Sequence, residues 1–239
     1  MKSELTIVIP AKNERRLLPN LLQSLCRQDY RFMPVTTVFI ADAGSTDGTQ
    51  EIALNFADRL RVKVIPGGLP SVGRNAGARL ADTPYVLFID ADIELEDPTL
   101  IRRAIRKMTQ KKLHCLTTHI WCKGGIWKDQ ALYLGNNIVQ FVSQFGQPFS
   151  TGMFMMFEKA KFDELGGFHE QALYAEDYLL SKQVSTRRFR LINGGVLTTN
   201  RRFQKMGHAH IVGMFLKTAL NTFNERYFLR DHKYWLPEG

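Results

Sequence analysis

Up to residue 112 the chain repeats one pattern four times: a short apolar stretch, then a segment with apolar residues at helical spacing. The expected strands are Leu5–Pro10, Val35–Ala41, Arg61–Ile65 and Tyr85–Ile89. The expected helices are Glu14–Cys26, Thr46–Ala57, Ser71–Leu80 and Pro98–Met108. Strands that are almost continuously apolar are typical of a parallel sheet covered by helices. The pattern therefore predicts an α/β fold, and ligands of such sheets bind at the carboxyl ends of the strands.

After residue 112 the pattern changes to longer amphipathic stretches. A long helix is expected at Trp127–Phe145, a strand at Gly152–Phe157, and helices near Lys159 and Tyr178. The stretch His210–Arg230 fits a packing helix better than a helix on a membrane surface, although both carry such an apolar stripe. No linker rich in Gly, Ser or Pro interrupts the chain. We therefore expect one domain over 1–239, with halves at 1–112 and 113–200 and a helical tail at 201–239.

The formal charge of the chain is +9, from 32 Lys and Arg against 23 Asp and Glu. Such a surface attracts diphosphates, nucleic acids or anionic lipid headgroups. The basic clusters, among them Arg102–Arg103 and Arg187–Arg188, are short and compatible with solvated helices. Nucleic-acid-binding proteins usually concentrate Lys and Arg in longer runs interleaved with aromatic residues. We therefore expect no nucleic-acid partner.

Cysteines and hydropathy bear on the location of the protein. The three cysteines form no CxxC pair, which favours a reducing compartment over a disulfide scaffold. The sequence shows neither a secretion signal nor an apolar run of about 18 residues. We expect a cytoplasmic protein, with peripheral contact to the anionic inner face of the membrane left open. The sequence does not indicate an oligomeric state.

Polar motifs follow directly after the expected strands. Pro10–Glu14 offers backbone N–H groups and a carboxylate to a base or a ribose, or simply caps a helix. Asp42, after the second strand, is placed to accept a hydrogen bond from a nucleobase N–H. In the segment Gly73–Gly77, Arg74 opens a helix, where a guanidinium and the positive end of the helix dipole suit a phosphate. The alternative is a surface helix whose glycines allow close packing.

Asp90 and Asp92 give the strongest chemical signal. They end the apolar strand Tyr85–Ile89, and a spacing of two residues puts both carboxylates on the same side. Carboxylates this close repel each other without a cation, and hard oxygen ligands suit Mg²⁺ or Mn²⁺ that bridges a diphosphate. The same spacing also occurs in plain turns. The motif therefore predicts a divalent metal only in combination with the others.

Together these motifs resemble glycosyltransferase family 2. The resemblance covers Thr6–Arg202 and rests on IVIPAKNE, DAGSTDGT, GRNAGARLADTPYVLFIDADIE and GGFHE, followed by Ala175-Glu176-Asp177. It implies a GT-A fold in which a Rossmann-like, mostly parallel nucleotide-sugar-binding half is merged with an acceptor-binding half. It also implies sugar transfer from a nucleoside-diphosphate donor, UDP- or GDP-linked, with Mg²⁺ or Mn²⁺ as cofactor. The acceptor, whether glycan, lipid or small molecule, is not indicated.

The resemblance also assigns roles to residues. The residues implied to hold the nucleotide are Pro10, Ala11, Asn13, Glu14, Asp42, Arg74, Asp90 and Ala91. Asp92 is the implied metal ligand, and Asp177 is the implied catalytic base with Glu176 positioning it or the acceptor. In such a reaction Asp177 takes the proton of an acceptor hydroxyl that attacks the anomeric carbon, and a single displacement inverts that carbon.

The C-terminal part departs from the family pattern. The QxxRW signature of processive synthases is absent, with Arg201-Arg202-Phe203 as a partial echo, so transfer of a single sugar is expected. Arg201 and Arg202 are expected to close over the diphosphate. His208 and His210 lie where relatives can supply a further metal or diphosphate ligand; an exposed helix start is the alternative.

Other functions remain as alternatives. A non-catalytic nucleotide-sugar-binding protein would keep the nucleotide residues but would not need Asp92 and Asp177. A sugar nucleotidyltransferase would carry a glycine-rich loop after the first strand, and Pro10–Glu14 contains no glycine. A dinucleotide-dependent oxidoreductase would need GxGxxG there, and this motif is absent.

Overall fold

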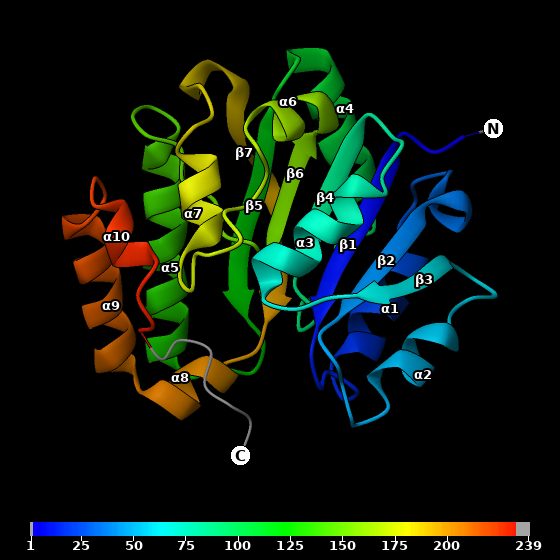
Figure 1. The fold of residues 1–239 in the computed structure, drawn as a ribbon, viewed down its shortest axis with the longest axis horizontal. Helices are drawn as coiled ribbons and strands as arrows, with labels where there is room; N and C mark the ends of the chain where they lie inside the picture. Colours follow the sequence, from blue (N-terminus) through cyan, green and yellow to red (C-terminus); the bar gives the residue numbers. More distant parts are fainter. Residues whose placement is uncertain (1, 233–239) are drawn as a thin grey trace.

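A seven-stranded sheet forms the centre of the molecule in a computed structural model that describes residues 2–232 (Figure 1). The strands are β1 Leu5–Ala11, β2 Thr37–Asp42, β3 Arg61–Pro66, β4 Tyr85–Ile89, β5 Cys115–Cys122, β6 Phe154–Glu158 and β7 Phe189–Thr198. Their order is β3-β2-β1-β4-β6-β5-β7. Only β6 runs antiparallel to its neighbours β4 and β5. The predicted α/β fold with a mostly parallel sheet is therefore confirmed.

Helices cover this sheet on both faces. They are α1 Leu18–Cys26, α2 Thr49–Leu54, α3 Pro70–Arg79, α4 Leu100–Lys111, α5 Trp127–Ser143, α6 Lys159–Glu164, α7 Glu176–Ser181, α8 Arg201–Met206, α9 His208–Leu220 and α10 Glu225–Phe228. The apolar faces of α1 and α4 pack with Ile7 and Ile9 of β1 into one core. On the opposite face, Val8 of β1 packs with residues of α3, α6 and α7. Each covered strand thus buries both of its faces, which explains its apolar sequence.

Close packing of α3 on β1 and β2 requires glycine. A Cβ on Gly77 would lie 2.4 Å from a methyl group of Val8, and a Cβ on Gly73 would lie 3.0 Å from Cβ of Ala41. The glycines of this motif thus bring the helix against the sheet. The helix begins at Pro70, so Arg74 lies in its middle rather than at its start. A proline is favoured in the first turn because it lacks the N–H that this turn leaves unpaired.

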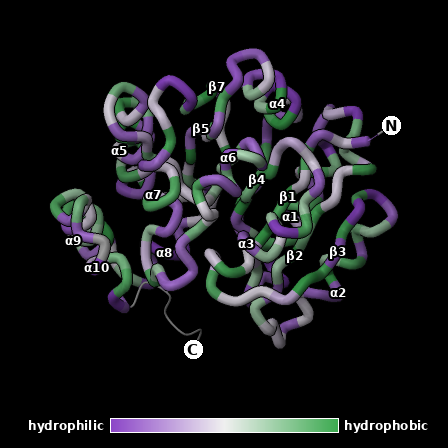
Figure 2. The backbone as a smooth tube through the Cα atoms, turned by 45° about the horizontal axis from the view of Figure 1, so that its top comes forward, coloured by the Kyte–Doolittle hydropathy of each residue, from purple (hydrophilic) through white to green (hydrophobic). Residues whose placement is uncertain are grey.

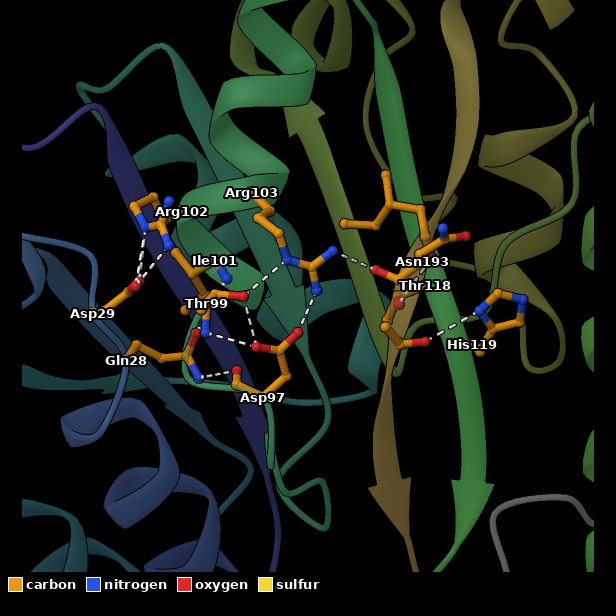
Figure 3. A network of polar contacts seen from close by, with 12 residues as sticks. Gln28, Asp29, Asp97, Thr99, Ile101, Arg102, Arg103, Thr118, His119 and Asn193 are labelled. Atoms are coloured by element: carbon orange, nitrogen blue, oxygen red, sulfur yellow. Dashed lines mark hydrogen bonds and ion pairs between the residues drawn. The ribbon is translucent and has the colours of Figure 1, made fainter.

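Strand β7 was not anticipated. The segment Asn193-Gly194-Gly195 reads as a turn, but it forms a bulge opposite Thr118 and His119, and pairing with β5 continues beyond it. Figure 3 shows how Arg103 of α4 holds this bulge: it donates a 2.7 Å hydrogen bond to the carbonyl of Asn193 and forms an ion pair with Asp97. The bulge therefore lies between α4 and β5, and β7 runs on to the same edge of the sheet as β4.

The C-terminal segment differs from the single amphipathic helix that was expected. It forms α8, α9 and α10, with breaks at Gly207 and around Asn221–Asn224. Helix α9 turns Ile211 and Met214 inward, and Met214 packs with Tyr174 and Phe228. Among residues 2–232, no helix combines the length and the apolar character needed to span a bilayer.

Candidate active site at the carboxyl edge of the sheet

A cavity of about 570 Å³ opens at the carboxyl ends of the parallel strands. Strand β1 contributes Pro10 and Ala11, β4 is followed by Asp90, Ala91 and Asp92, and β7 ends in Thr198. The remaining lining residues are Lys12, Glu14, Ala43, Gly68, Leu69, Pro70, Tyr133, Met153, Thr199, Arg201, Arg202, Lys205 and Met206. The volume lies within the range of about 300–1,000 Å³ that is usual for ligand sites. The cavity is the natural candidate for the functional site.

The first two motifs are bonded to each other at the edge of this cavity. Asn13 has a left-handed backbone with φ of 53°, its N–H donates a 2.9 Å hydrogen bond to Ser45, and its side-chain oxygen accepts one from Thr46 N–H. Asp42 is buried and accepts hydrogen bonds from Ser45, Gly44 and Gln50. Asn13 and Asp42 do not line the cavity itself, so their contact with a nucleotide stays a prediction.

Burial and hydrogen bonding act on Asp42 in opposite directions. Burial raises the pKa of this carboxyl, but the hydrogen bonds from the Ser45 hydroxyl and backbone and from Gln50 outweigh burial. The pKa of Asp42 therefore lies below its usual value. The carboxylate is held charged and oriented at the end of β2.

Arg201 closes one side of the cavity. Its guanidinium makes a two-pronged contact with Glu14, with distances of 2.6 and 3.2 Å, between segments 187 residues apart. A terminal nitrogen also lies 3.8 Å from Oδ2 of Asp92. Together with Lys12, Arg202 and Lys205, this arginine gives the cavity four basic side chains against the three acids Glu14, Asp90 and Asp92. The balance suits a polyanionic ligand accompanied by a cation.

Asp92 faces the cavity with a side chain that is 21% exposed. The hydroxyl of Thr198 donates a long hydrogen bond of 3.4 Å to it. Burial, followed by the negative charge of Asp90, raises the pKa of Asp92. Burial, followed by the negative charge of Asp92, also raises the pKa of the Tyr133 phenol. A cation beside Asp92 would relieve this charge penalty.

The donor set around Asp92 fits Mg²⁺ or Mn²⁺ only in combination with a ligand. Within residues 2–232, no three or more His, Cys, Asp or Glu side chains converge to hold a metal ion. A divalent cation bound by one or two carboxylates therefore needs further oxygens from a diphosphate and water, which is the usual way Mg²⁺ is held. Asp90 and Asp92 are the two carboxylates that can contribute hard oxygen ligands to such a site.

Arg74 lies beneath the cavity floor, buried between two acids. It donates hydrogen bonds of 2.6 Å to Asp90 and to Glu176, and its side chain is 2% exposed. These carboxylates raise the pKa of Arg74 despite the opposing effect of burial, so it stays charged. Arg74 does not line the cavity. It lies in the middle of α3 and not at the helix start where a phosphate contact was expected. Its role toward a nucleotide stays a prediction.

Asp177 lies next to this buried arginine. Its carboxylate accepts 2.7 Å hydrogen bonds from the N–H groups of Gly152 and Tyr178, and Gly152 precedes the cavity residue Met153. Burial, then the charge of Glu176, raises the pKa of Asp177 to about 7, with Arg74 opposing both. A carboxylate that exchanges its proton near neutral pH is suited to general-base work. Asp177 itself does not line the cavity in this structure.

His208 and His210 lie away from the cavity. His208 Nε2 lies 2.6 Å from a carboxylate oxygen of Asp129, and the imidazole stacks on Phe203 with centroids 5.3 Å apart. His210 is exposed on α9. Neither residue lines the cavity, so the metal role of His208 and the diphosphate role of His210 stay predictions. For His208, that role would require its pair with Asp129 to separate.

Some cavity residues were not singled out in the sequence. Lys12 belongs to the motif Pro10–Glu14 and was available as a basic side chain at a strand end. Tyr133, Thr198 and Lys205 carried no local signal. Thr198 reaches the site only because β7 runs parallel to β4, and Tyr133 only because α5 packs beside β5.

Comparison with known proteins bears on this arrangement. The family model described as glycosyl transferase family 2 matches residues 6–166. Validoxylamine A glucosyltransferase of Streptomyces hygroscopicus subsp. jinggangensis is 37% identical over 93 residues, which are 37% of this chain and 22% of that protein. The poly(ribitol-phosphate) beta-N-acetylglucosaminyltransferase TarS of Staphylococcus aureus is 30% identical over 99 residues, or 40% of this chain and 17% of TarS. These matches therefore span about a fifth of the length of each of these two curated relatives.

Solved structures share the fold. TarS 1-349 of S. aureus in complex with UDP-GlcNAc has a TM-score of 0.67 at 20% identity, covering 83% of this chain and 58% of that one. The mannosyltransferase PcManGT of Pyrobaculum calidifontis, in complex with GDP-Man and Mn2+, has a TM-score of 0.68 at 19% identity, covering 92% and 65%. At these identities the likeness concerns the fold.

Proposed function

Because the chain belongs to glycosyl transferase family 2, we propose that it transfers a single sugar, with inversion, from a UDP- or GDP-linked donor to a hydroxyl acceptor. The observation that carries the proposal is the placement of Asp90 and Asp92 in a cavity of about 570 Å³ together with four basic side chains. Relatives act in the same chemical class: one is a glucosyltransferase and one an N-acetylglucosaminyltransferase. A solved mannosyltransferase of this fold binds GDP-Man and Mn2+.

In this proposal the donor lies along the carboxyl ends of β1 and β4. Pro10, Ala11 and Glu14 line the side of the nucleoside, with Asn13 and Asp42 fixing the loops behind them. Arg201 and Arg202 line the same cavity, where their positive charge counters the diphosphate. A divalent cation held by Asp92 would supply charge neutralisation of the departing diphosphate. The Arg201–Glu14 contact keeps one side of the cavity closed.

Asp177 supplies the base. Its pKa of about 7 lets it hold a proton taken from an acceptor hydroxyl and release it afterwards. Glu176, through Arg74, links this base to Asp90 at the donor end. Gly152, whose N–H binds this carboxylate, directly precedes the cavity residue Met153. Attack opposite the leaving diphosphate then inverts the anomeric carbon.

A donor screen tests the proposal. Purified protein is incubated with UDP- and GDP-linked sugars, with Mn²⁺, Mg²⁺ or EDTA, and release of UDP or GDP is measured together with thermal stabilisation. We expect one donor class to be hydrolysed slowly and to stabilise the protein only with a divalent cation. Stabilisation by free nucleotide without any turnover, across all donors and acceptors screened, would instead favour the non-catalytic binding protein.

A further inference from the structure

Helix α5 is oriented with its polar side toward the protein. Asn137 accepts a hydrogen bond from the N–H of Ile120 and donates one to its carbonyl, both at 2.9 Å. Gln130 does the same for Cys122, with a 2.6 Å bond to the carbonyl. Strand β6 pairs with β5 only at Cys115–Thr117, so these amides cover the edge of β5 that β6 leaves open. Backbone groups of an open edge need such partners, and this need fixes the inward polar face of α5.

The outer side of α5 is therefore apolar. Leu134, Ile138, Phe141 and Val142 follow at helical spacing, and each is about half exposed. Phe145, just after the helix, is 77% exposed. A helix on the surface of a soluble protein ordinarily has the opposite polarity, with its apolar stripe toward the core. An apolar face of this length marks a contact with a partner or a membrane.

Helix α9 adds a second apolar face at the same end of the molecule. Its inward residues Ile211 and Met214 are buried, while Phe215 and Leu216 are at least half exposed. Leu220 is 86% exposed, and Phe223 beyond the helix is 94% exposed. Figures 1 and 2 both place α9 and α5 at the end opposite β3. We call the outer faces of these two helices the α5–α9 surface.

Within the two segments that carry this surface, the exposed charges have one sign. Residues 118–157 contain a single acid, Asp129, which is buried and paired with His208. Residues 201–224 contain no acid. Lys128, Lys205 and Lys217 are exposed on α5, α8 and α9. Apolar side chains flanked by basic ones, with no exposed acid in either segment, complement an anionic bilayer, where the aromatics enter the acyl boundary and the lysines meet the headgroups.

We propose that the α5–α9 surface docks this protein on an anionic lipid bilayer. A second copy of the chain is the less suitable occupant, because a self-contact would bring the lysines of both copies together without acids to pair with. Docking of this kind does not depend on sugar transfer. It sets α8, which carries the cavity residues Arg201 and Arg202, next to the bilayer, because α8 leads directly into α9.

Cosedimentation with vesicles tests the docking. The wild type is mixed with vesicles of phosphatidylcholine alone or with phosphatidylglycerol at a molar ratio of about 3:1, at low and high salt. We expect binding to the anionic vesicles that weakens with salt. The double variant Phe141→Ser/Phe145→Ser should partition about 30-fold less, since it removes two exposed aromatics from the surface. Leu54→Ser replaces an apolar residue on α2 that is as exposed as Phe141; it is the matched control and should bind like the wild type.

A second double variant tests the proposal independently if Phe141→Ser/Phe145→Ser does not fold. Lys128→Gln/Lys217→Gln touches exposed residues only, and it should weaken binding to anionic vesicles and flatten its salt dependence. Absence of sedimentation with anionic vesicles at low salt, or equal binding by the wild type and both double variants, overturns the docking. If sedimentation velocity shows a wild-type dimer that Phe141→Ser/Phe145→Ser makes monomeric, while vesicles are not bound, the surface joins two copies of the chain and the proposal is wrong.

Discussion

Arg74 on α3 donates a 2.6 Å hydrogen bond to Glu176 on α7, although 102 residues separate them. The other terminal nitrogen of the same guanidinium binds Asp90, directly after β4. Because Arg74 is buried and paired with acids on both sides, it fixes the distance between Asp90, which is proposed to contact the sugar donor, and the pair Glu176–Asp177. The arginine thereby joins the two halves of the candidate site without lining the cavity.

Replacement of Arg74 by methionine tests this role. Arg74→Met keeps much of the side-chain volume but leaves Glu176 as an uncompensated buried charge, and breaking a buried ion pair from one side costs about 3–5 kcal/mol. We expect the free energy of unfolding to fall by an amount near the lower end of this range, because Asp90 is partly exposed. Urea denaturation measures it. Arg79→Met, which breaks an exposed pair with Glu170, is the control and should cost at most about 1 kcal/mol. Equal losses in the two variants would contradict a structural role for the buried pair.

Gly152 offers an independent test of the same packing. A Cβ at this position would lie 2.2 Å from a terminal nitrogen of Arg74, which has no room to move between its two acids. Gly152→Ala should therefore destabilise the protein by about 2 kcal/mol or more, as overpacking does elsewhere. Gly135, inside α5 with open space around it, is the matched glycine. Gly135→Ala should stabilise the helix by about 0.5–1 kcal/mol. Thermal denaturation of both variants would show opposite shifts.

Much of the first half of the fold could be predicted, because its signals are local. The strand positions follow from apolar runs, and the sites after β1 and β4 follow from the rule that ligands bind at strand ends. The family and the mostly parallel sheet are confirmed. Helix ends were less accurate: α1 starts at Leu18, not Glu14, because Glu14–Leu17 form a turn before Pro19.

The remainder depends on contacts between distant residues. Strand β7 contains a pair of glycines, and only its long pairing with β5 keeps that segment extended. Arg74 was expected at the start of the helix Ser71–Leu80, and its buried pairing with Glu176, 102 residues further along the chain, has no local signal. The outward apolar face of α5 likewise could not be predicted from the sequence. The helix turns its amides inward because they bind the part of β5 that β6 does not pair with, and that contact depends on the fold. The roles of the site residues and the division of the chain at 112 and 200 stay predictions.

The metal proposal predicts a specific binding defect. In Asp92→Ala the cavity loses the carboxylate proposed to hold the cation, so UDP or GDP should no longer bind more tightly in Mn²⁺ than in EDTA. In the wild type the same comparison should show tighter binding with Mn²⁺. Isothermal titration calorimetry measures both. Glu51→Ala removes an acid from α2, outside the cavity lining, and should behave as the wild type. Equal affinity of the wild type in Mn²⁺ and in EDTA would show that the metal role is wrong.

The raised pKa of Asp177 predicts an unusual dependence of stability on pH. Its carboxyl releases its proton near pH 3.8 when unfolded but near pH 7 when folded, because burial and Glu176 disfavour the charged form. Between these values the folded state binds more protons, so this group lowers the free energy of unfolding as pH rises, by up to about 1.4 kcal/mol per unit. Asp177→Asn removes this contribution. Plotted against pH from 4 to 7, the difference in stability between variant and wild type should therefore increase; a constant difference would indicate an ordinary pKa.

Loss of the proposed base should separate catalysis from binding. Asp177→Asn preserves size and can still accept a hydrogen bond from Gly152, but the amide cannot take a proton from an acceptor. Transfer should fall by about 10²–10⁴-fold, while calorimetry should find donor affinity close to that of the wild type, since Asp177 does not line the cavity. In the wild type, kcat/KM should fall about tenfold per pH unit below pH 7, as the base becomes protonated. Asp82→Asn, which alters an exposed pair with Lys2, serves as the matched control and should retain full activity. A folded Asp177→Asn protein that still transfers sugar would refute the assignment and direct the search for the base to Glu176.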